Sequence, residues 1–196
     1  MDASIIAGGG FLPHPKHSER QRVAPKCTLV WQTVCMQAWM DFEAVSGVWL
    51  RLVGGAEGLR AIDLHRSLPV EGKADGGHPV LREAARQIRA YFTGGLREFR
   101  LPLDPQGTTF QLRVWRQLLD IPYGETRSYA WLAEAIGAPK AVRAVGAANG
   151  ANPLAIVVPC HRVIGSNGSL TGYGGGLPMK RRLLALERGE IALFEG

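Results

Sequence analysis

The feature that most constrains the fold of this chain is a change in the spacing of its apolar residues near residue 105. From Val45 to Leu64 apolar and polar residues alternate around a Gly54-Gly55 turn region, which predicts an antiparallel pair of strands. Beyond a linker over 102–107, apolar residues recur with the helical period. We therefore expect an irregular or disordered extension (1–38), an α/β domain with a small antiparallel sheet (39–105) and a mainly α domain (106–196).

Further elements of the α/β domain follow from local signals. Pro79 begins an amphipathic helix that ends at Gly94-Gly95, and its arginines are typical of a solvated face. The segment Arg97 to Leu103 reads as a short strand that runs into the linker.

The second domain predicts a winged-helix-like helix-turn-helix. A helix over 110–119 is followed by Ser128 as the N-cap of a helix over 129–136, a break at Gly137, and a helix over 140–148 that starts after Pro139. An ordinary helical hairpin fits the same signals.

The last of these helices carries mostly small side chains. Arg143 is followed by Ala144, Val145, Gly146 and Ala147, so a single long cationic side chain begins a surface of small residues. Such a surface can approach a nucleic-acid groove closely, with the arginine reaching the base stack. Tight packing inside a protein core is the competing interpretation.

Composition adds two weaker constraints. The net charge is +6 and the sequence pI is near 9.6, which favours a polyanionic partner such as nucleic acid. Three cysteines, an odd number, indicate a reducing compartment. The sequence shows no apolar run long enough to span a membrane and no secretion signal, so we expect a cytoplasmic protein, or a nuclear one in a eukaryote, with no membrane partner.

The extension contains Cys27 and Cys35 together with His14 and His17. A zinc site is one interpretation, but the spacing matches no standard ligand pattern, and free thiols are favoured. No metal site is expected. Met36 and Met40 are alternative first residues of the natural protein.

Cys160 is the strongest candidate for chemistry. An apolar run with strand character, Leu154 to Val158, leads into Pro159-Cys160-His161-Arg162, and basic neighbours lower the pKa of a thiol. Adjacent side chains diverge, however, so a bridging water would have to join Cys160 to His161, with a carboxylate orienting the imidazole. Glu187, on an expected helix over 179–188, is one candidate.

The loop over 165–176 follows directly, and half of its twelve residues are glycine. Backbone amides in such a loop can approach a planar ligand, and Tyr173 can pack against it. The loop is therefore expected to be a pocket wall, with a flexible linker as the alternative.

At this point the sequence resembles the O6-alkylguanine-DNA alkyltransferases over roughly Val45 to Leu193. The resemblance rests on four motifs in order: Ile121-Pro122-Tyr123-Gly124-Glu125-Thr126, Arg143-Ala144-Val145-Gly146, Asn152-Pro153 and the run containing Cys160. It implies direct, single-turnover transfer of a methyl or larger alkyl group from guanine O6 to Cys160. It also implies double-stranded DNA as the partner, bound through the minor groove with the damaged base flipped out, a monomer, and no cofactor.

The resemblance also implies roles for individual residues. Cys160 attacks the alkyl carbon, and His161, held by Glu187, removes the thiol proton through water. Arg143 fills the gap left by the flipped base. Tyr129 crowds the phosphate, which helps to rotate the base out, and its hydroxyl donates a hydrogen bond to the guanine ring. Asn152 supports the hinge between the recognition helix and the active site. Val163, Tyr173 and Gly174 resemble guanine-binding residues, and the further DNA contacts implied are Ala144, Gly146, Ala147 and Ser166.

Two departures and three rival functions remain. Ser46-Gly47 replaces the Ser-Pro common near the first strand of the family, and nothing before about Ala38 matches, including the zinc ligands of some members. A non-catalytic sensor of alkylated bases that recruits other repair factors is the first rival, but such relatives carry Trp at the position of Cys160. A cysteine hydrolase and a DNA-binding regulator with an incidental cysteine are the others. Repair of O4-alkylthymine is left open.

Overall fold

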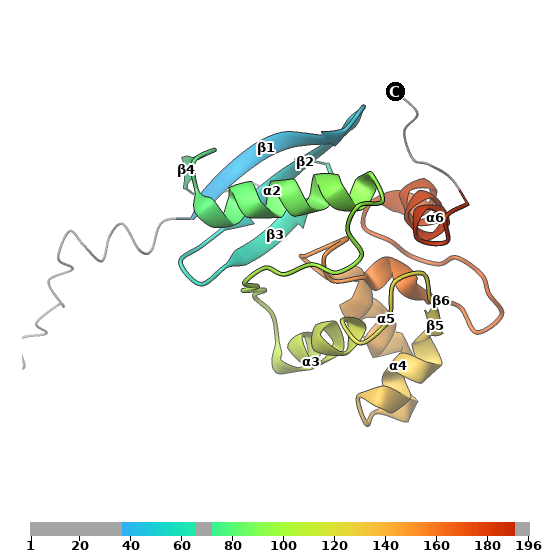
Figure 1. The fold of residues 1–196 in the computed structure, drawn as a ribbon. Helices are drawn as coiled ribbons and strands as arrows, with labels where there is room; N and C mark the ends of the chain where they lie inside the picture. The colour runs from blue at the N-terminus through green and yellow to red at the C-terminus, as the bar shows by residue number, and fades with distance from the viewer. Residues whose placement is uncertain (1–36, 66–71, 191–196) are drawn as a thin grey trace, which may run out of the picture.

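The structure, a computed structural model, describes residues 37–65 and 72–190. Its N-terminal half holds a four-stranded sheet of order β3-β2-β1-β4 (Figure 1). The strands are β1 (Ala38–Val45), β2 (Val48–Gly54), β3 (Leu59–Asp63) and β4 (Lys73–Ala74). The pairs β1/β2 and β2/β3 are antiparallel, whereas β4 joins β1 in parallel. An α/β domain with a small sheet is confirmed, and the two-residue β4 makes that sheet mixed.

The strand β1 was not among the expected elements. Its alternation is nevertheless regular, because Phe42 and Ala44 are buried while Glu43 between them is exposed. It begins at Ala38, one residue before the expected start of the domain. The earlier residues, with Cys27, Cys35, His14, His17 and Met36, lie outside the described residues.

Helix α2 (Pro79–Phe92) covers one face of the sheet, as Figure 1 shows. It starts at Pro79 and ends before Gly94-Gly95, as predicted. Its buried face includes Leu81, Ala84 and Ile88, while Arg82, Arg86 and Arg89 are exposed. The arginines therefore lie on the solvated face.

The expected strand over 97–103 is wrong. Gln87 on α2 takes the place of a partner strand, because its side chain accepts from the N–H of Arg100 and donates to the carbonyl of the same residue, both at 2.8 Å. Only Leu103 forms an isolated bridge, with Leu59. At that bridge Gly58 has φ 154°, and a Cβ there would lie 2.4 Å from the Pro102 carbonyl oxygen, so the close approach requires glycine.

The C-terminal half is mainly helical. Its elements are α3 (Thr109–Leu118), β5 (Arg127–Ser128), α4 (Tyr129–Ala135), the 3-10 helix η1 (Pro139–Ala141), α5 (Val142–Gly150), the 3-10 helix η2 (Cys160–Arg162), β6 (Val163–Ile164) and α6 (Gly176–Glu187). Thr108 and Gln111 form a capping box at α3, and the Ser128 hydroxyl accepts from Trp131 N–H at 3.0 Å to cap α4.

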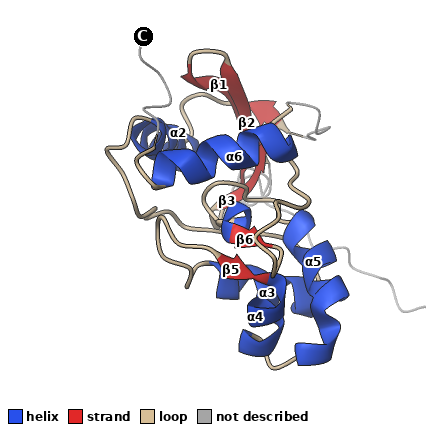
Figure 2. Cartoon of the chain, turned by 90° about the vertical axis from the view of Figure 1, so that its right-hand side faces the viewer, coloured by secondary structure: helices blue, strands red, loops and turns tan. Residues whose placement is uncertain are grey.

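Helices α4 and α5 form the expected helical pair. Their inner faces share the core through Leu132, Val145 and Ala148, which are buried. Helix α5 starts at Val142 instead of Lys140, because Pro139 opens a separate 3-10 turn. Figure 2 shows the parallel pair β5/β6 between this helical region and α6. Among the described residues, no helix is long and apolar enough to cross a membrane.

Candidate active site

The apolar run before Cys160 is buried, but the expectation of a strand is wrong. Leu154 makes one isolated bridge to Ile62, and the chain then turns, with Ile156 at φ 77° and Val158 N–H bonded to the Leu154 carbonyl at 2.8 Å. Asn152 holds the turn from both sides. Its amide donates to the Val158 carbonyl at 2.8 Å, and its oxygen accepts from Leu154 N–H at 3.0 Å. A side chain thus replaces a strand partner, and the turn delivers Cys160 to η2.

Cys160 is a buried thiol, with 4% of its surface exposed. Burial raises the pKa of this thiol, whereas a hydrogen bond from Asn152 and the charge of Lys180 act in the opposite direction. The side-chain amide of Asn149 on α5 also reaches the Cys160 carbonyl, at 3.4 Å. Burial therefore favours the protonated thiol over the thiolate.

His161 is fully buried, and its Nε2 lies 2.8 Å from Oε1 of Glu187. Burial lowers the pKa of the imidazole, and this outweighs the opposite effect of Glu187. A neutral imidazole that donates from Nε2 to the carboxylate presents an unprotonated Nδ1. That atom is buried and has no hydrogen-bond partner among the described residues. His161 therefore carries a free proton acceptor within the core.

Glu187, the carboxylate in contact with His161, lies on α6 and is buried. It also accepts two hydrogen bonds from the Arg162 guanidinium, each at 2.9 Å, and one from Gly124 N–H at 3.0 Å. The Tyr91 hydroxyl donates to Oε1 at 2.6 Å. Burial alone would raise the pKa of this carboxyl, but His161 and Arg162 outweigh it and lower the pKa to about 2. Glu187 is thus an anion at neutral pH despite its burial.

The Gly-rich segment lies over the same site. The Tyr173 ring meets His161 edge-on, with centroids 6.4 Å apart, and its hydroxyl is buried without a partner among the described residues. Burial and the nearby Cys160 raise the pKa of that hydroxyl. The Gly174 carbonyl lies 3.0 Å from His65 Nε2, which ties the loop to the N-terminal half. The loop is therefore a wall of the site, although the Ser166 turn is exposed.

Lys180 joins this wall to the active-site turn. Its ammonium is buried and donates to the Val163 carbonyl at 2.6 Å and to the Thr171 carbonyl at 2.8 Å. The Tyr129 hydroxyl donates to the same Thr171 carbonyl at 3.4 Å. One lone pair of the Val163 carbonyl is thus taken by Lys180, and Tyr129 lies at the edge of the same wall.

Helix α5 presents its bare face to solvent. Arg143, Ala144 and Ala147 are exposed, whereas Val145 and Ala148 pack inward, with the Ala148 carbonyl held by Trp115 Nε1 at 2.7 Å. A Cβ on Gly146 would make only ordinary contact with the Tyr129 ring, at 3.8 Å. Core packing therefore explains only the inner half of this helix.

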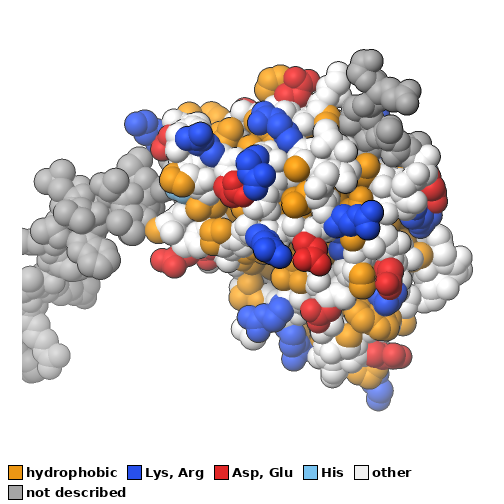
Figure 3. Space-filling model, in the orientation of Figure 1, with side chains coloured by type: hydrophobic (Ala, Val, Ile, Leu, Met, Phe, Trp, Pro, Cys, Tyr) orange, Lys and Arg blue, Asp and Glu red, His pale blue; other side chains and the backbone are white. Residues whose placement is uncertain are grey.

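Among the described residues, the face shown in Figure 3 carries no patch made of basic side chains alone. On the face shown in Figure 3, basic side chains are spread out with acidic ones between them. The distinguishing feature of α5 is instead a single arginine beside small residues, next to the ring of Tyr129.

The structure brings all but one of the predicted catalytic side chains into one hydrogen-bonded region around Cys160, and places Tyr129 at its border. Tyr91, Lys180 and the pairing of Arg162 with Glu187 were not expected. The burial of Lys180 could have been predicted from the sequence, since this lysine shares a helix face with Leu183, Leu184 and Glu187. No sequence pattern marks Tyr91 as part of the site, because it fits the apolar face of α2 like its neighbours there. In the described ranges, no group of three His, Cys, Asp or Glu side chains could hold a metal ion.

Comparison with known proteins matches both halves of the chain. Residues 50–105 match the ribonuclease-like domain of 6-O-methylguanine DNA methyltransferase, and residues 109–189 match its DNA binding domain. Together the two segments cover well over half of the chain.

Individual relatives agree. A methylated-DNA–protein-cysteine methyltransferase of Mycolicibacterium paratuberculosis is 68% identical over 105 residues, which are 54% of this chain and 64% of the relative. One from Methanosarcina barkeri is 52% identical over 143 residues, covering 71% of this chain and 90% of the relative. The crystal structure of Mycobacterium tuberculosis OGT in complex with DNA superposes with a TM-score of 0.73 at 47% identity, over 81% of this chain and 99% of that one. The chain belongs to the 6-O-methylguanine DNA methyltransferase family.

Proposed function

We propose that this protein repairs DNA by moving an alkyl group from O6 of guanine to the sulfur of Cys160, once per chain. The observation that carries the proposal is a buried thiol followed directly by a buried neutral imidazole whose Nδ1 has no partner among the described residues. The relatives named above are methylated-DNA–protein-cysteine methyltransferases, and that name, with methylated DNA and a protein cysteine in it, supports the same chemistry.

The reaction is a displacement in which every proton has a carrier. The Cys160 thiol gives its proton through one water to Nδ1 of His161, and Glu187 stabilises the imidazolium that forms. The sulfur attacks the alkyl carbon, a C–S bond forms, and the C–O6 bond breaks with its electron pair going to guanine. The guanine anion then gains a proton from the Tyr129 hydroxyl. Tyr129 takes a proton back from water, and the His161 imidazolium releases its proton to water, so the net result is that the thiol proton ends on guanine. The product is a thioether, which water does not hydrolyse readily, so the protein is consumed.

The partner is double-stranded DNA that contains O6-alkylguanine. We assign the contact to the minor groove and to the exposed face of α5, where Ala144, Gly146 and Ala147 let the backbone approach closely. Arg143 enters the space of the flipped nucleotide. Tyr129, beside Gly146, crowds the phosphate of that nucleotide and so helps to rotate the base out of the helix. Ser166 contacts the strand from the loop over 165–176.

The remaining residues hold the extruded base. Tyr173, Gly174 and the backbone of Val163 form the guanine wall, and Asn152 couples α5 to the Cys160 turn. In this proposal the domain over 106–196 carries DNA binding and transfer, and the domain over 39–105 supports it. The protein acts as a monomer without a cofactor. Since the relatives named are bacterial and archaeal, we place the repair in the cytoplasm.

A labelled-substrate assay tests the proposal. Duplex DNA with a labelled methyl group on guanine O6 is incubated with the protein, which is then digested. We expect one methyl per chain on the peptide containing Cys160, and no turnover beyond that amount. Cys160→Ala should bind the DNA and leave the label on it. A matched control, Cys27→Ala with Cys35→Ala, should still accept one methyl. Label that stays on DNA with the unaltered protein would instead identify a non-catalytic sensor.

A further inference from the structure

The N-terminal domain reaches the active-site carboxylate through one side chain. Tyr91, near the end of α2, is completely buried and donates its hydroxyl hydrogen to Oε1 of Glu187 at 2.6 Å. The same hydroxyl oxygen lies 3.5 Å from Nε2 of His161. Both views of the fold place this end of α2 beside α6 (Figures 1 and 2). The proposed base and its orienting carboxylate therefore share a third group that comes from outside the transfer domain.

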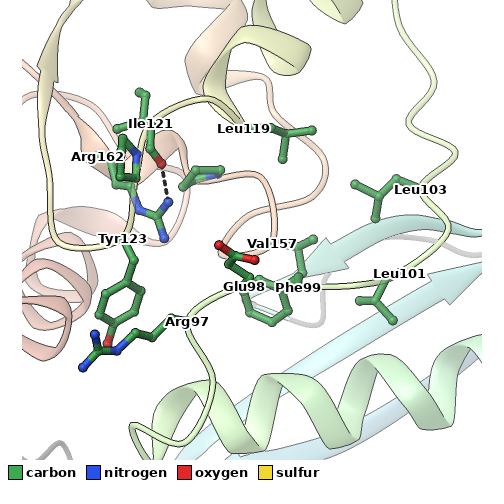
Figure 4. A pocket seen from close by; sticks show the side chains of 12 residues that line it. Arg97, Glu98, Phe99, Leu101, Leu103, Leu119, Ile121, Tyr123, Val157 and Arg162 are labelled. Atoms are coloured by element: carbon green, nitrogen blue, oxygen red, sulfur yellow. Dashed lines mark hydrogen bonds between the residues drawn. The ribbon is translucent and has the colours of Figure 1, made fainter.

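The packing around Tyr91 fixes its direction. Its ring meets those of Phe92 at 5.7 Å and Phe99 at 5.3 Å, both from the N-terminal half, and that of Tyr123 at 6.1 Å from the other half. Tyr123 in turn lies against two guanidinium groups, those of Arg97 and Arg162. Figure 4 shows Tyr123 with Arg97 and Arg162, which line a cavity of about 620 Å³ formed by residues of both halves. With its ring enclosed, Tyr91 presents its hydroxyl to Oε1 as a preset donor.

Oε1 of Glu187 serves three donors at once. It accepts from Tyr91 at 2.6 Å, from His161 at 2.8 Å and from Nη2 of Arg162 at 2.9 Å. Each additional donor spreads the negative charge of the oxygen and weakens its pull on a proton at His161. The shortest of the three contacts belongs to Tyr91, and its removal takes away a donor of Oε1 without removing a charge.

We propose that the Tyr91 hydroxyl is a positioning group that shares Oε1 of Glu187 with His161 and thereby keeps the imidazole in its neutral, proton-accepting form. The inference rests on the proposed role of His161 as base. The other charged or titratable groups that face His161 are Glu187 and Lys180 on α6, Arg162 and Cys160 on η2, and Tyr173 on the loop over 165–176. All of them stay in place when only the Tyr91 hydroxyl is changed.

The direction of the effect follows from the charge. Without the Tyr91 donor, Glu187 stabilises an imidazolium more strongly, so His161 stays protonated to higher pH. Since the protonated ring accepts no proton from Cys160, the acid limb of the pH–rate profile moves to higher pH. A stronger donor at the same place moves the limb to lower pH.

The test is a pair of changes with opposite expected signs. Tyr91→Phe keeps the ring and removes the hydroxyl, and 3-fluorotyrosine incorporated at position 91 strengthens the donor. Transfer is measured from free O6-alkylguanine base, which removes DNA binding from the rate, over the acid limb. We expect a shift of about one pH unit upward for Tyr91→Phe and a smaller downward shift for 3-fluorotyrosine. At pH values above both limbs, the two rates should agree within about threefold.

Tyr123→Phe is the matched control. It removes a phenol hydroxyl from the same aromatic cluster, but within the described residues that hydroxyl makes no hydrogen bond to Glu187, so its acid limb should coincide with that of the unaltered protein. Equal acid limbs in Tyr91→Phe, 3-fluorotyrosine and unaltered protein would overturn the inference, as would shifts of the same sign. Transfer to Cys160 in the unaltered protein tests the proposed function separately, since it does not depend on the comparison.

Discussion

The interior around Cys160 and the outer face of α5 are built on opposite principles. Around Cys160, charged and polar side chains are buried and held by one another, as in the contacts of Glu187 with His161 and Arg162. On α5, Arg143 is exposed beside Ala144 and Ala147, and small side chains leave the backbone accessible. The first region is preorganised before any ligand arrives, whereas the second, in the proposed function, gains its contacts only with DNA.

This difference separates two kinds of substitution. A change in the buried region should slow transfer from a free base and from duplex DNA alike, and should also lower the free energy of unfolding. A change on the α5 face should affect the duplex alone and leave the fold intact. Substitutions in the two regions therefore test this division by comparing the two substrates and the free energy of unfolding.

Glu187→Gln should have the largest effect. Loss of the carboxylate removes the partner that stabilises a protonated His161, so transfer should slow by about 10²–10³-fold on both substrates. It also leaves the buried Arg162 without its counter-ion, which should cost about 3 kcal/mol in the free energy of unfolding. Single-turnover rates and urea titrations measure the two effects.

Glu190→Gln is the control for that variant. Glu190 is exposed and lies 3.6 Å from Arg188 in a surface pair, so its substitution should change neither quantity appreciably. If Glu187→Gln slowed transfer only from duplex DNA, the buried contacts would not serve the chemistry, and the contrast between the regions would fail.

Arg143→Ala should show the reverse pattern. We expect transfer from duplex DNA to slow by roughly 10–10²-fold, because the flipped nucleotide loses the side chain that fills its place, while transfer from the free base stays within about twofold. Arg82→Ala removes the same charge from the exposed face of α2 and should change duplex repair little. Equal losses on the two substrates would show that Arg143 does not fill the space of the flipped nucleotide.

The pH dependence of stability belongs to the buried region alone. Glu187 has its pKa lowered to about 2 in the fold, so its stabilisation is full above its ordinary pKa of 4.5 and is lost as the pH falls from there toward 2. Burial lowers the pKa of His161 below 6.5, so the unfolded chain takes up a proton that the folded one refuses, and stability falls with pH there too. Both effects have the same sign.

We therefore expect the free energy of unfolding to decrease steadily below about pH 6.5, with Glu187 contributing roughly 3 kcal/mol of the loss. Urea titrations at several pH values measure it. In Glu187→Gln the free energy of unfolding should depend less on pH below pH 4.5. In Arg143→Ala it should change with pH as it does in the unaltered protein, because an arginine stays charged throughout this range. A stability independent of pH would contradict the charged state assigned to Glu187.

The two regions also differ in how far the sequence could predict them. Helix α4 and the bare face of α5 follow from local signals, namely the Ser128 cap, Gly137 and the run of small residues after Arg143. The Cys160 turn does not, because Leu154 to Val158 is as apolar as a buried strand, and the bonds that turn it come from the Asn152 side chain and from Val158 N–H to the Leu154 carbonyl. In the same way Gln87 replaces a partner strand for Arg100.

Long-range polar contacts were the least predictable part. Glu187 was a candidate because the chemistry needs a carboxylate, yet nothing local to Tyr91 marks it as the donor to that carboxylate from 96 residues away. Its burial and its place in the apolar stripe of α2 are those of a core residue. A buried polar group shows its partner only when distant elements pack, as α2 and α6 do here.

The smallest effect expected is that of Ala147→Leu. The added atoms point from the exposed face of α5 into solvent, so the free energy of unfolding should change by less than about 0.5 kcal/mol and transfer from the free base should be unchanged. The larger side chain holds the backbone away from the groove, so duplex repair should slow by roughly tenfold. Ala135→Leu, also exposed but at the end of α4, is the matched control and should slow neither reaction. Equal duplex rates for the two variants would show that the small residues of α5 serve the fold alone, because only a surface that meets DNA distinguishes one exposed leucine from another.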